Sequence, residues 1–185
     1  MMDRRTFLGA SLALVSTPAV SMLARADRHG VVSPALERTL EASPFVYLSP
    51  LRSNGRESTC HAEVWYAWLD GTVVMIVSRD RWKASAIRRG LTSARVWVGD
   101  YGRWKRVLGS DETFREGPSF DAKGSLSEDP ALLEELIAAY QKKYPNEIEK
   151  WAPRFRNGLN EGSSVLIRYE PTALRDAAAR LRRVA

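Results

Sequence analysis

The chain has 185 residues, and its 28 lysines and arginines exceed its 22 acidic residues to give a net charge of +6. This length suits one domain with a sizeable core, and the positive charges are mixed with acidic ones, which disfavours a nucleic-acid groove and favours a small anionic ligand. The single cysteine, Cys60, excludes an internal disulfide, and the two histidines give no metal-binding cluster.

Two arginines precede an apolar stretch at the start of the chain. Arg4 and Arg5 stand before residues 7–20, which are too short and too rich in small residues to span a bilayer, for which about 20 apolar residues are needed. This pattern resembles the twin-arginine export signal, and residues 24–26 offer a cleavage site near Ala26. The alternative is an ordinary secretory or lipid-associated signal whose positive region contains two arginines.

The first structured elements are a short helix and three extended runs. Ser33 as a cap and Pro34 at the first helical position predict the helix. Residues 45–48 predict a strand. Residues 61–69 and 72–77 are aromatic and β-branched runs joined by an Asp-Gly pair, which predicts a hairpin.

The middle of the chain alternates between helix and strand patterns. Residues 79–89 predict a helix that Gly90 closes. Residues 94–98 predict a strand and residues 120–126 a weaker one, whereas residues 103–118 give no clear pattern.

The clearest helix begins near the last third of the chain. Asp129 caps it, Pro130 opens it and Pro145 ends it. We expect a loop through residues 151–155 and a last strand over residues 164–169. The short hairpins in this order predict a largely antiparallel barrel with helices on its outside, in the mainly-β or α+β class.

Four stretches in this order resemble the split β-barrel of the pyridoxamine-5'-phosphate-oxidase-like flavin-binding superfamily. They lie within roughly residues 45–171 and comprise 65–77, 78–84, 94–98, and the pair 122–125 and 140–145. The resemblance implies an antiparallel split β-barrel that dimerises and binds FMN, or in some branches the deazaflavin F420, at the subunit interface. A homodimer is also expected because a barrel exposing many aromatic residues leaves an apolar patch in water.

The resemblance also implies which residues hold the cofactor. In that superfamily a hydroxyl residue and a cation after the third strand hold the ribityl phosphate, and these positions correspond to Ser78, Arg79 and Lys83. Trp82 and Trp104 flank cations and can stack on a planar ring. The alternative is a helix cap at Ser78 with solvated charges after it.

The second predicted strand departs from the superfamily pattern, because flavin-binding members often carry an arginine or another hydrogen-bonding group there. His61 and Glu63 share one face of this strand. They are weak catalytic candidates, with His61 as a donor or acid and Glu63 fixing its tautomer; otherwise they form a solvated strand end. The departure leaves open whether a cofactor is bound.

These observations predict four segments: a signal peptide over 1–26, a lead-in with a short helix over 27–42, the barrel over 43–171 and a basic helical tail over 172–185. We expect export by the twin-arginine translocase to the periplasm or beyond, without a stable membrane anchor. The expected function is that of an FMN-binding oxidoreductase-like protein acting on a small molecule. The alternatives are a cofactor-free binding or structural module, or a barrel that binds F420 or haem.

Overall fold

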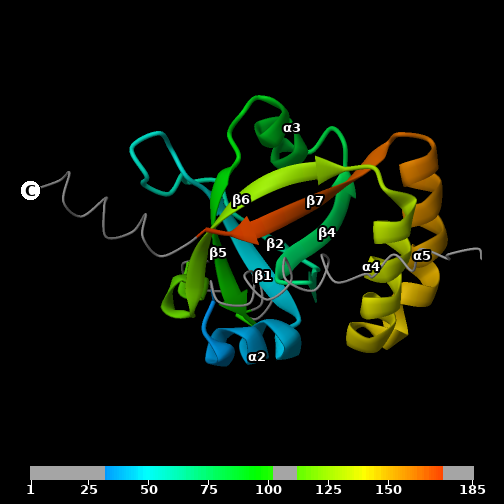
Figure 1. The fold of residues 1–185 in the computed structure, drawn as a ribbon, viewed down its shortest axis with the longest axis horizontal. Helices are drawn as coiled ribbons and strands as arrows, with labels where there is room; N and C mark the ends of the chain where they lie inside the picture. Colours follow the sequence, from blue (N-terminus) through cyan, green and yellow to red (C-terminus); the bar gives the residue numbers. More distant parts are fainter. Residues whose placement is uncertain (1–31, 102–111, 173–185) are drawn as a thin grey trace, which may run out of the picture.

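A curled antiparallel sheet of seven strands forms the centre of the fold, and helices pack on its outside (Figure 1). The computed structural model describes residues 32–101 and 112–172. The elements are α2 (Pro34–Ala42), β1 (Phe45–Pro50), β2 (Ala62–Val64), β3 (Ala67–Leu69), β4 (Thr72–Ser78), α3 (Trp82–Arg88), β5 (Ser93–Gly99), the 3-10 helix η1 (Thr113–Glu116), β6 (Ser119–Ser127), α4 (Pro130–Lys143), α5 (Pro145–Asn160) and β7 (Ser164–Pro171). The predicted split β-barrel class is confirmed.

The strand order shows why the sheet curls. The order is β2-β1-β5-β6-β7-β4-β3, so β2 and β3 lie at its two ends. Only Trp65 and Tyr66 separate them along the chain. Because each extended residue spans at most about 3.6 Å, the two edges must come close, and the sheet must curl.

The predicted single strand over residues 61–69 is therefore wrong. Tyrosine hydroxyls from the end of α4, rather than a neighbouring strand, satisfy the backbone where the chain crosses between the two edges. The Tyr144 hydroxyl accepts the Tyr66 N–H at 3.2 Å, and the Tyr140 hydroxyl donates to the Trp65 carbonyl at 3.0 Å. These bonds replace the ladder bonds that a continuous strand would make.

The predicted hairpin after this crossing is confirmed, although it joins β4 to the short β3. Asp70 and Gly71 both have positive φ, at 47° and 74°. Two such residues form the turn whose twist matches that of the flanking strands.

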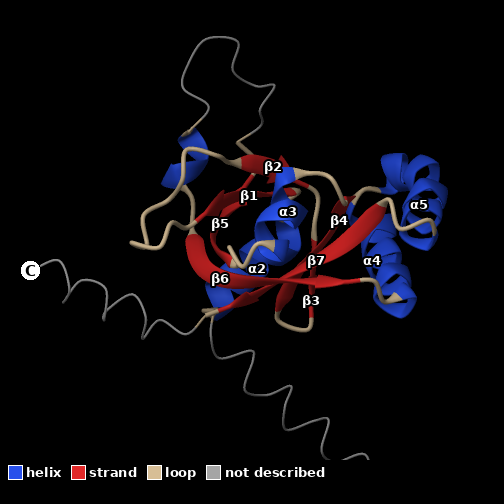
Figure 2. Ribbon diagram, turned by 90° about the horizontal axis from the view of Figure 1, so that it is seen from above, coloured by secondary structure: helices blue, strands red, loops and turns tan. Residues whose placement is uncertain are grey.

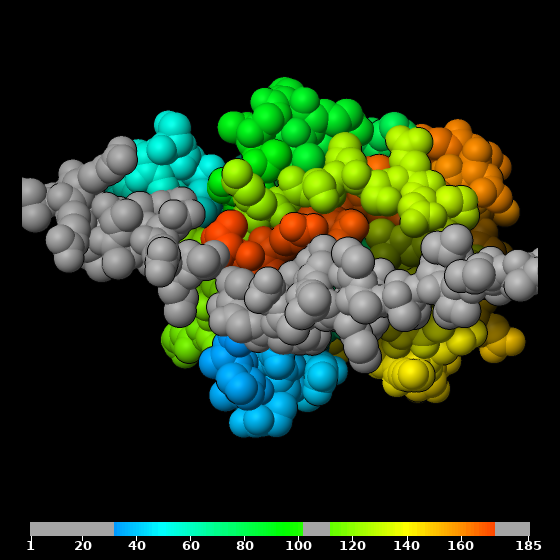
Figure 3. Space-filling model, in the orientation of Figure 1, coloured from blue at the N-terminus to red at the C-terminus, as the bar shows by residue number. Residues whose placement is uncertain are grey.

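The core lies on both faces of the sheet. Along β4, Val73 and Met75 pack inside the curl with residues of α2 and α3, whereas Val74 faces the other way and packs under α4 and α5. Figure 2 shows α4 and α5 side by side at one end of the sheet. In Figure 3 the helices lie around the edge of the viewed face, with α2 in blue, α3 in green, and α4 and α5 in yellow to orange.

Two predicted helix starts are confirmed by their caps. The Ser33 hydroxyl accepts the Leu36 N–H at 3.2 Å at the start of α2. The Asp129 carboxylate accepts the Ala131 N–H at 2.9 Å at the start of α4.

The predicted loop through residues 151–155 is wrong, because these residues belong to α5. Pro145 occupies the first position of this helix, where its missing N–H costs nothing. Pro153 lies inside the helix with its ring exposed, while Ile148 and Leu159 are buried against the sheet and α4.

The predicted signal peptide and nearly all of the predicted tail lie outside the described residues. Within residues 32–101 and 112–172, no helix is both long enough and apolar enough to cross a membrane.

Candidate ligand-binding pocket

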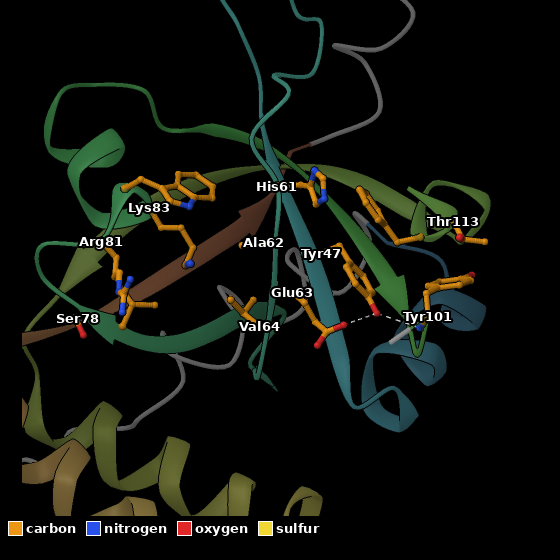
Figure 4. Close-up of a pocket in the computed structure, with 13 residues that line it drawn as sticks. Tyr47, His61, Ala62, Glu63, Val64, Ser78, Arg81, Lys83, Tyr101 and Thr113 are labelled. Atoms are coloured by element: carbon orange, nitrogen blue, oxygen red, sulfur yellow. Dashed lines mark hydrogen bonds between the residues drawn. The ribbon is translucent and has the colours of Figure 1, made fainter. Parts of the chain in front are cut away.

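A pocket of about 460 Å³ opens beside β2, between the end of β4, the start of α3, and η1. Figure 4 shows its side chains converging from these elements. They are Tyr47, His61, Ala62, Glu63, Val64, Val77, Ser78, Arg81, Trp82, Lys83, Tyr101, Thr113 and Phe114.

One end of the pocket is cationic. Ser78 ends β4, Arg81 immediately precedes α3, and Lys83 lies in the first turn of α3. Figure 4 shows the Lys83 amine directed into the pocket. Burial, and then the neighbouring Arg81 charge, lower the pKa of Lys83. A negative group bound here would favour the charged form of Lys83 and raise its pKa again.

Arg79, the predicted phosphate contact, is not among the pocket-lining residues. Its Nε donates to the Gly162 carbonyl at 2.6 Å, and its guanidinium pairs with Glu128 at 2.7 Å. These contacts tie the end of β4 to the turn before β7 and to the segment before α4. The structure therefore brings Arg81, not Arg79, beside Ser78 and Lys83.

The reason lies in the backbone, since α3 begins three residues later than predicted. The Arg79 N–H donates to the Ser163 carbonyl at 2.8 Å, which extends the β4–β7 pairing beyond Ser78. The helix begins only at Trp82, and its cap residue, Arg81, makes no side-chain cap bond.

The opposite end of the pocket holds a hydrogen-bonded chain. The Tyr47 hydroxyl donates to Glu63 at 2.9 Å and accepts the Tyr101 N–H at 3.0 Å. His61 and Glu63 both line the pocket, as their shared face predicts. The Glu63 carboxylate accepts the hydrogen bond from Tyr47, and the His61 ring lies 5.0 Å from that of Phe114.

Aromatic rings form a wall at this end. The Phe114 ring stacks on the Tyr47 ring with their centroids 4.9 Å apart and their planes 7° apart. The Phe114 side chain is only 1% exposed. The two stacked rings therefore form an apolar wall at this end of the pocket.

Sequence reasoning missed Arg81, Tyr47, Tyr101 and Phe114. Phe114 lies in the segment without a clear pattern, and Tyr47 stands in a continuous run of buried residues in β1, so neither gave a signal. Trp82 does line the pocket, with the Lys83 ammonium 5.1 Å from its ring centroid. Trp104 lies outside the described residues.

The arrangement suits an elongated ligand with an anionic group at one end and a planar group at the other. Over residues 32–101 and 112–172, no three acidic, histidine or cysteine side chains gather as a metal site would require. Cys60 is exposed and does not line the pocket.

No protein-family model matches the chain, and no curated protein matches it in sequence. A conserved hypothetical protein of Mycobacterium tuberculosis, Rv2991, superposes with a TM-score of 0.50 at 20% identity, covering 75% of this chain and 79% of the other. HutZ, a haem storage protein of Vibrio cholerae, gives 0.48 at 14% identity and covers 76% and 89% of the two chains. A Listeria innocua protein named "Putative Pyridoxamine 5'-phosphate oxidase" gives 0.47 at 14% identity and covers 74% and 90%. At these identities the likeness to the Mycobacterium protein shows a shared fold, the split barrel.

Proposed function

We propose that the pocket binds FMN and that the protein is a flavin-dependent oxidoreductase of the split-barrel type, acting on a small molecule in the periplasm. The observation that carries this proposal is the convergence of Ser78, Arg81 and Lys83 at one end of a pocket whose other end is aromatic.

The cationic end fits a phosphate. Arg81 and Lys83 supply two positive charges and Ser78 a hydroxyl donor. Hydrogen bonds from cationic donors to an anion are roughly twice as strong as neutral ones. Burial, and then the Arg81 charge, lower the pKa of Lys83 in the ligand-free protein, and a phosphate monoester would offset the repulsion between the two cations.

The rest of the pocket fits a planar ring. Trp82 flanks the cationic end and Phe114 forms the opposite wall. The volume lies within the range of about 300–1,000 Å³ that is typical of small-molecule sites. FMN supplies hydride transfer when bound, and the protein residues hold the phosphate, orient the ring and exclude water.

Substitution of Lys83 tests the phosphate assignment. Lys83→Ala removes one charge-assisted contact worth roughly 1.5–3 kcal/mol, so FMN affinity should fall about ten- to a hundredfold. Riboflavin lacks the phosphate, and its affinity should hardly change. Calorimetric titration of both ligands into wild type and variant measures the two effects.

The matched control is Arg79→Gln, which removes a neighbouring cation that does not line the pocket. Its FMN affinity should equal that of the wild type. Equal losses for FMN and riboflavin in Lys83→Ala contradict the phosphate site. If the wild-type protein binds neither flavin, the proposal fails, and a cofactor-free module or a barrel for F420 or haem becomes the better one.

Location and assembly are part of the same proposal. The Arg4-Arg5 pattern supports export by the twin-arginine translocase. The resemblance to split-barrel flavoproteins supports a homodimer in which a second copy completes the ligand site.

A further inference from the structure

Glu57 joins three parts of the chain through one carboxylate. It lies in the loop between β1 and β2, and its side chain is only 14% exposed. It accepts hydrogen bonds from Arg95 at 3.4 Å, from the Trp97 indole at 3.2 Å, and from Arg115. Arg95 and Trp97 belong to β5, whereas Arg115 belongs to η1, so the carboxylate connects a loop, the sheet and the 3-10 helix.

The helix η1 has little backbone support of its own. It is four residues long. Its backbone bonds include Arg115 N–H to Glu112 at 3.0 Å and Gly117 N–H to Phe114 at 3.1 Å. Such short 3-10 segments have poor hydrogen-bond geometry, so side-chain contacts determine where η1 lies.

The position of η1 determines the aromatic wall of the pocket. Phe114 immediately precedes Arg115, and its ring touches both Tyr47 and His61. The Arg115 guanidinium lies 5.0 Å from the Phe114 ring centroid. A displacement of Arg115 therefore moves the ring that lines the planar end of the pocket.

We propose that Glu57 is a positioning residue for the planar end of the ligand, because it anchors Arg115 and thereby holds Phe114 against Tyr47. Glu57 does not line the pocket, so it acts through Phe114 rather than by touching the ligand. The role in ligand binding rests on the proposed function, whereas the anchoring of η1 does not.

Hydrogen exchange in the ligand-free protein tests the anchoring. Glu57→Gln keeps the shape of the side chain and removes its charge, so amides of residues 112–117 should exchange faster. The matched control is Asp121→Asn, because Asp121 also pairs with Arg95, at 2.9 Å, but belongs to β6 and not to the loop that carries Glu57. Unchanged exchange in Glu57→Gln, or equal acceleration in both variants, overturns the proposal.

A double-mutant cycle tests whether Glu57 acts through Phe114. Glu57→Gln should weaken both FMN and riboflavin about three- to tenfold, since the ring end is affected rather than the phosphate end. In a Phe114→Leu background the same substitution should have no further effect. Affinities are measured by calorimetry well below the unfolding temperature of each variant, so that a general loss of stability does not change the measured affinity. Additive losses overturn the proposal.

Arg115→Gln provides the reciprocal test should Glu57→Gln fail to fold. It leaves Glu57 bonded to Arg95 and Trp97 while releasing η1. It should reproduce the faster exchange and the equal weakening of both flavins, and wild-type behaviour contradicts the proposal. If the wild type binds neither flavin, the proposed function fails, while the exchange experiment still decides whether Glu57 holds η1.

Discussion

Lys143 is the residue at which charge and burial conflict most clearly. Its ammonium donates to the Leu40 carbonyl at 3.1 Å and lies 3.6 Å from the centroid of the Tyr66 ring. These contacts stabilise the ammonium but do not replace the lost water, and burial lowers the pKa of Lys143 to about 8. Lys143 thus connects α4 to the end of α2, but its charge is partly removed from water.

This environment predicts that stability rises in alkaline solution. Between about pH 8 and pH 10 the unfolded chain keeps a proton on Lys143 that the folded protein has released, so the free energy of unfolding increases with pH. Solvent on the exposed side of the side chain limits the rise to about 1 kcal/mol. Urea unfolding at a series of pH values measures it, and Lys143→Met should remove most of it.

The control for this experiment is Lys142→Met, which removes an exposed neighbouring charge and should retain the rise. Lys83, whose pKa burial also lowers, accounts for a smaller remaining increase. Above about pH 10 the sign reverses, because burial raises the pKa of Tyr169 to about 12 and that of Tyr66 further, and the unfolded chain then loses protons that the folded protein keeps. A flat profile in the wild type from about pH 8 to pH 10 contradicts the prediction.

Elements with local signals were predictable from the sequence, and those fixed by distant contacts were not. The capping residue Asp129 gave the start of α4, and the Asp-Gly pair gave the hairpin between β3 and β4. The break between β2 and β3 depends on Tyr144, 78 residues away from Tyr66 in sequence. No pattern within the run 61–69 reveals that partner.

The same distinction explains the candidate site. The cationic end was predictable because Ser78 and Lys83 stand close together in sequence, and Trp82 between them does line the pocket. The choice between Arg79 and Arg81 was not, because it depends on the β4–β7 pairing continuing through Ser163. Phe114 stacks on Tyr47, and its neighbour Arg115 bonds to Glu57; both partners lie far from η1 in sequence.

Helix α5 was missed because Pro153 looks like a helix breaker. Proline inside a helix removes the bond that its N–H would donate to the carbonyl four residues earlier, here that of Glu149. The buried positions Ile148, Ala152 and Leu159 nevertheless repeat with a helical period, and burial of this face outweighs the loss.

Replacing this proline should therefore stabilise the protein. Pro153→Ala restores the helical bond at an exposed position, and after allowance for the more flexible unfolded chain it should raise the free energy of unfolding by about 1–2 kcal/mol. Denaturant unfolding measures the change. Pro145→Ala is the matched control: Pro145 stands at the first helical position, so its replacement should not stabilise. A loss of stability in Pro153→Ala contradicts the prediction.

At the scale of the whole molecule, the aromatic side chains within the described residues pack against other parts of the same chain. Within residues 32–101 and 112–172, the one large hydrophobic residue that is mainly exposed is Leu91, with 55% of its surface accessible to solvent. Trp65 stacks on Tyr144 with ring centroids 4.5 Å apart, for example. The aromatic side chains in this part of the chain are buried or half-buried, and the homodimer stays a prediction.

The contacts that hold the sheet also bear on export. The crossing at Trp65 and Tyr66 bonds to tyrosines at the end of α4, so the curled sheet depends on residues far along the chain. The fold requires no disulfide, since Cys60 is the single cysteine, and it can therefore be completed in a reducing cytoplasm. A protein that folds there, and binds its cofactor there, needs an export route that accepts folded cargo.

The twin-arginine assignment predicts that this route depends on Arg4 and Arg5. Replacing both with lysine keeps the positive charge of the region but should leave unprocessed precursor in the cytoplasm, as fractionation and immunoblotting would show. The control replaces Arg25 with lysine, near the expected cleavage site, which should leave export intact. An ordinary secretory signal requires only positive charge, so normal appearance of the mature protein outside the inner membrane in the double variant would contradict the assignment and favour that alternative.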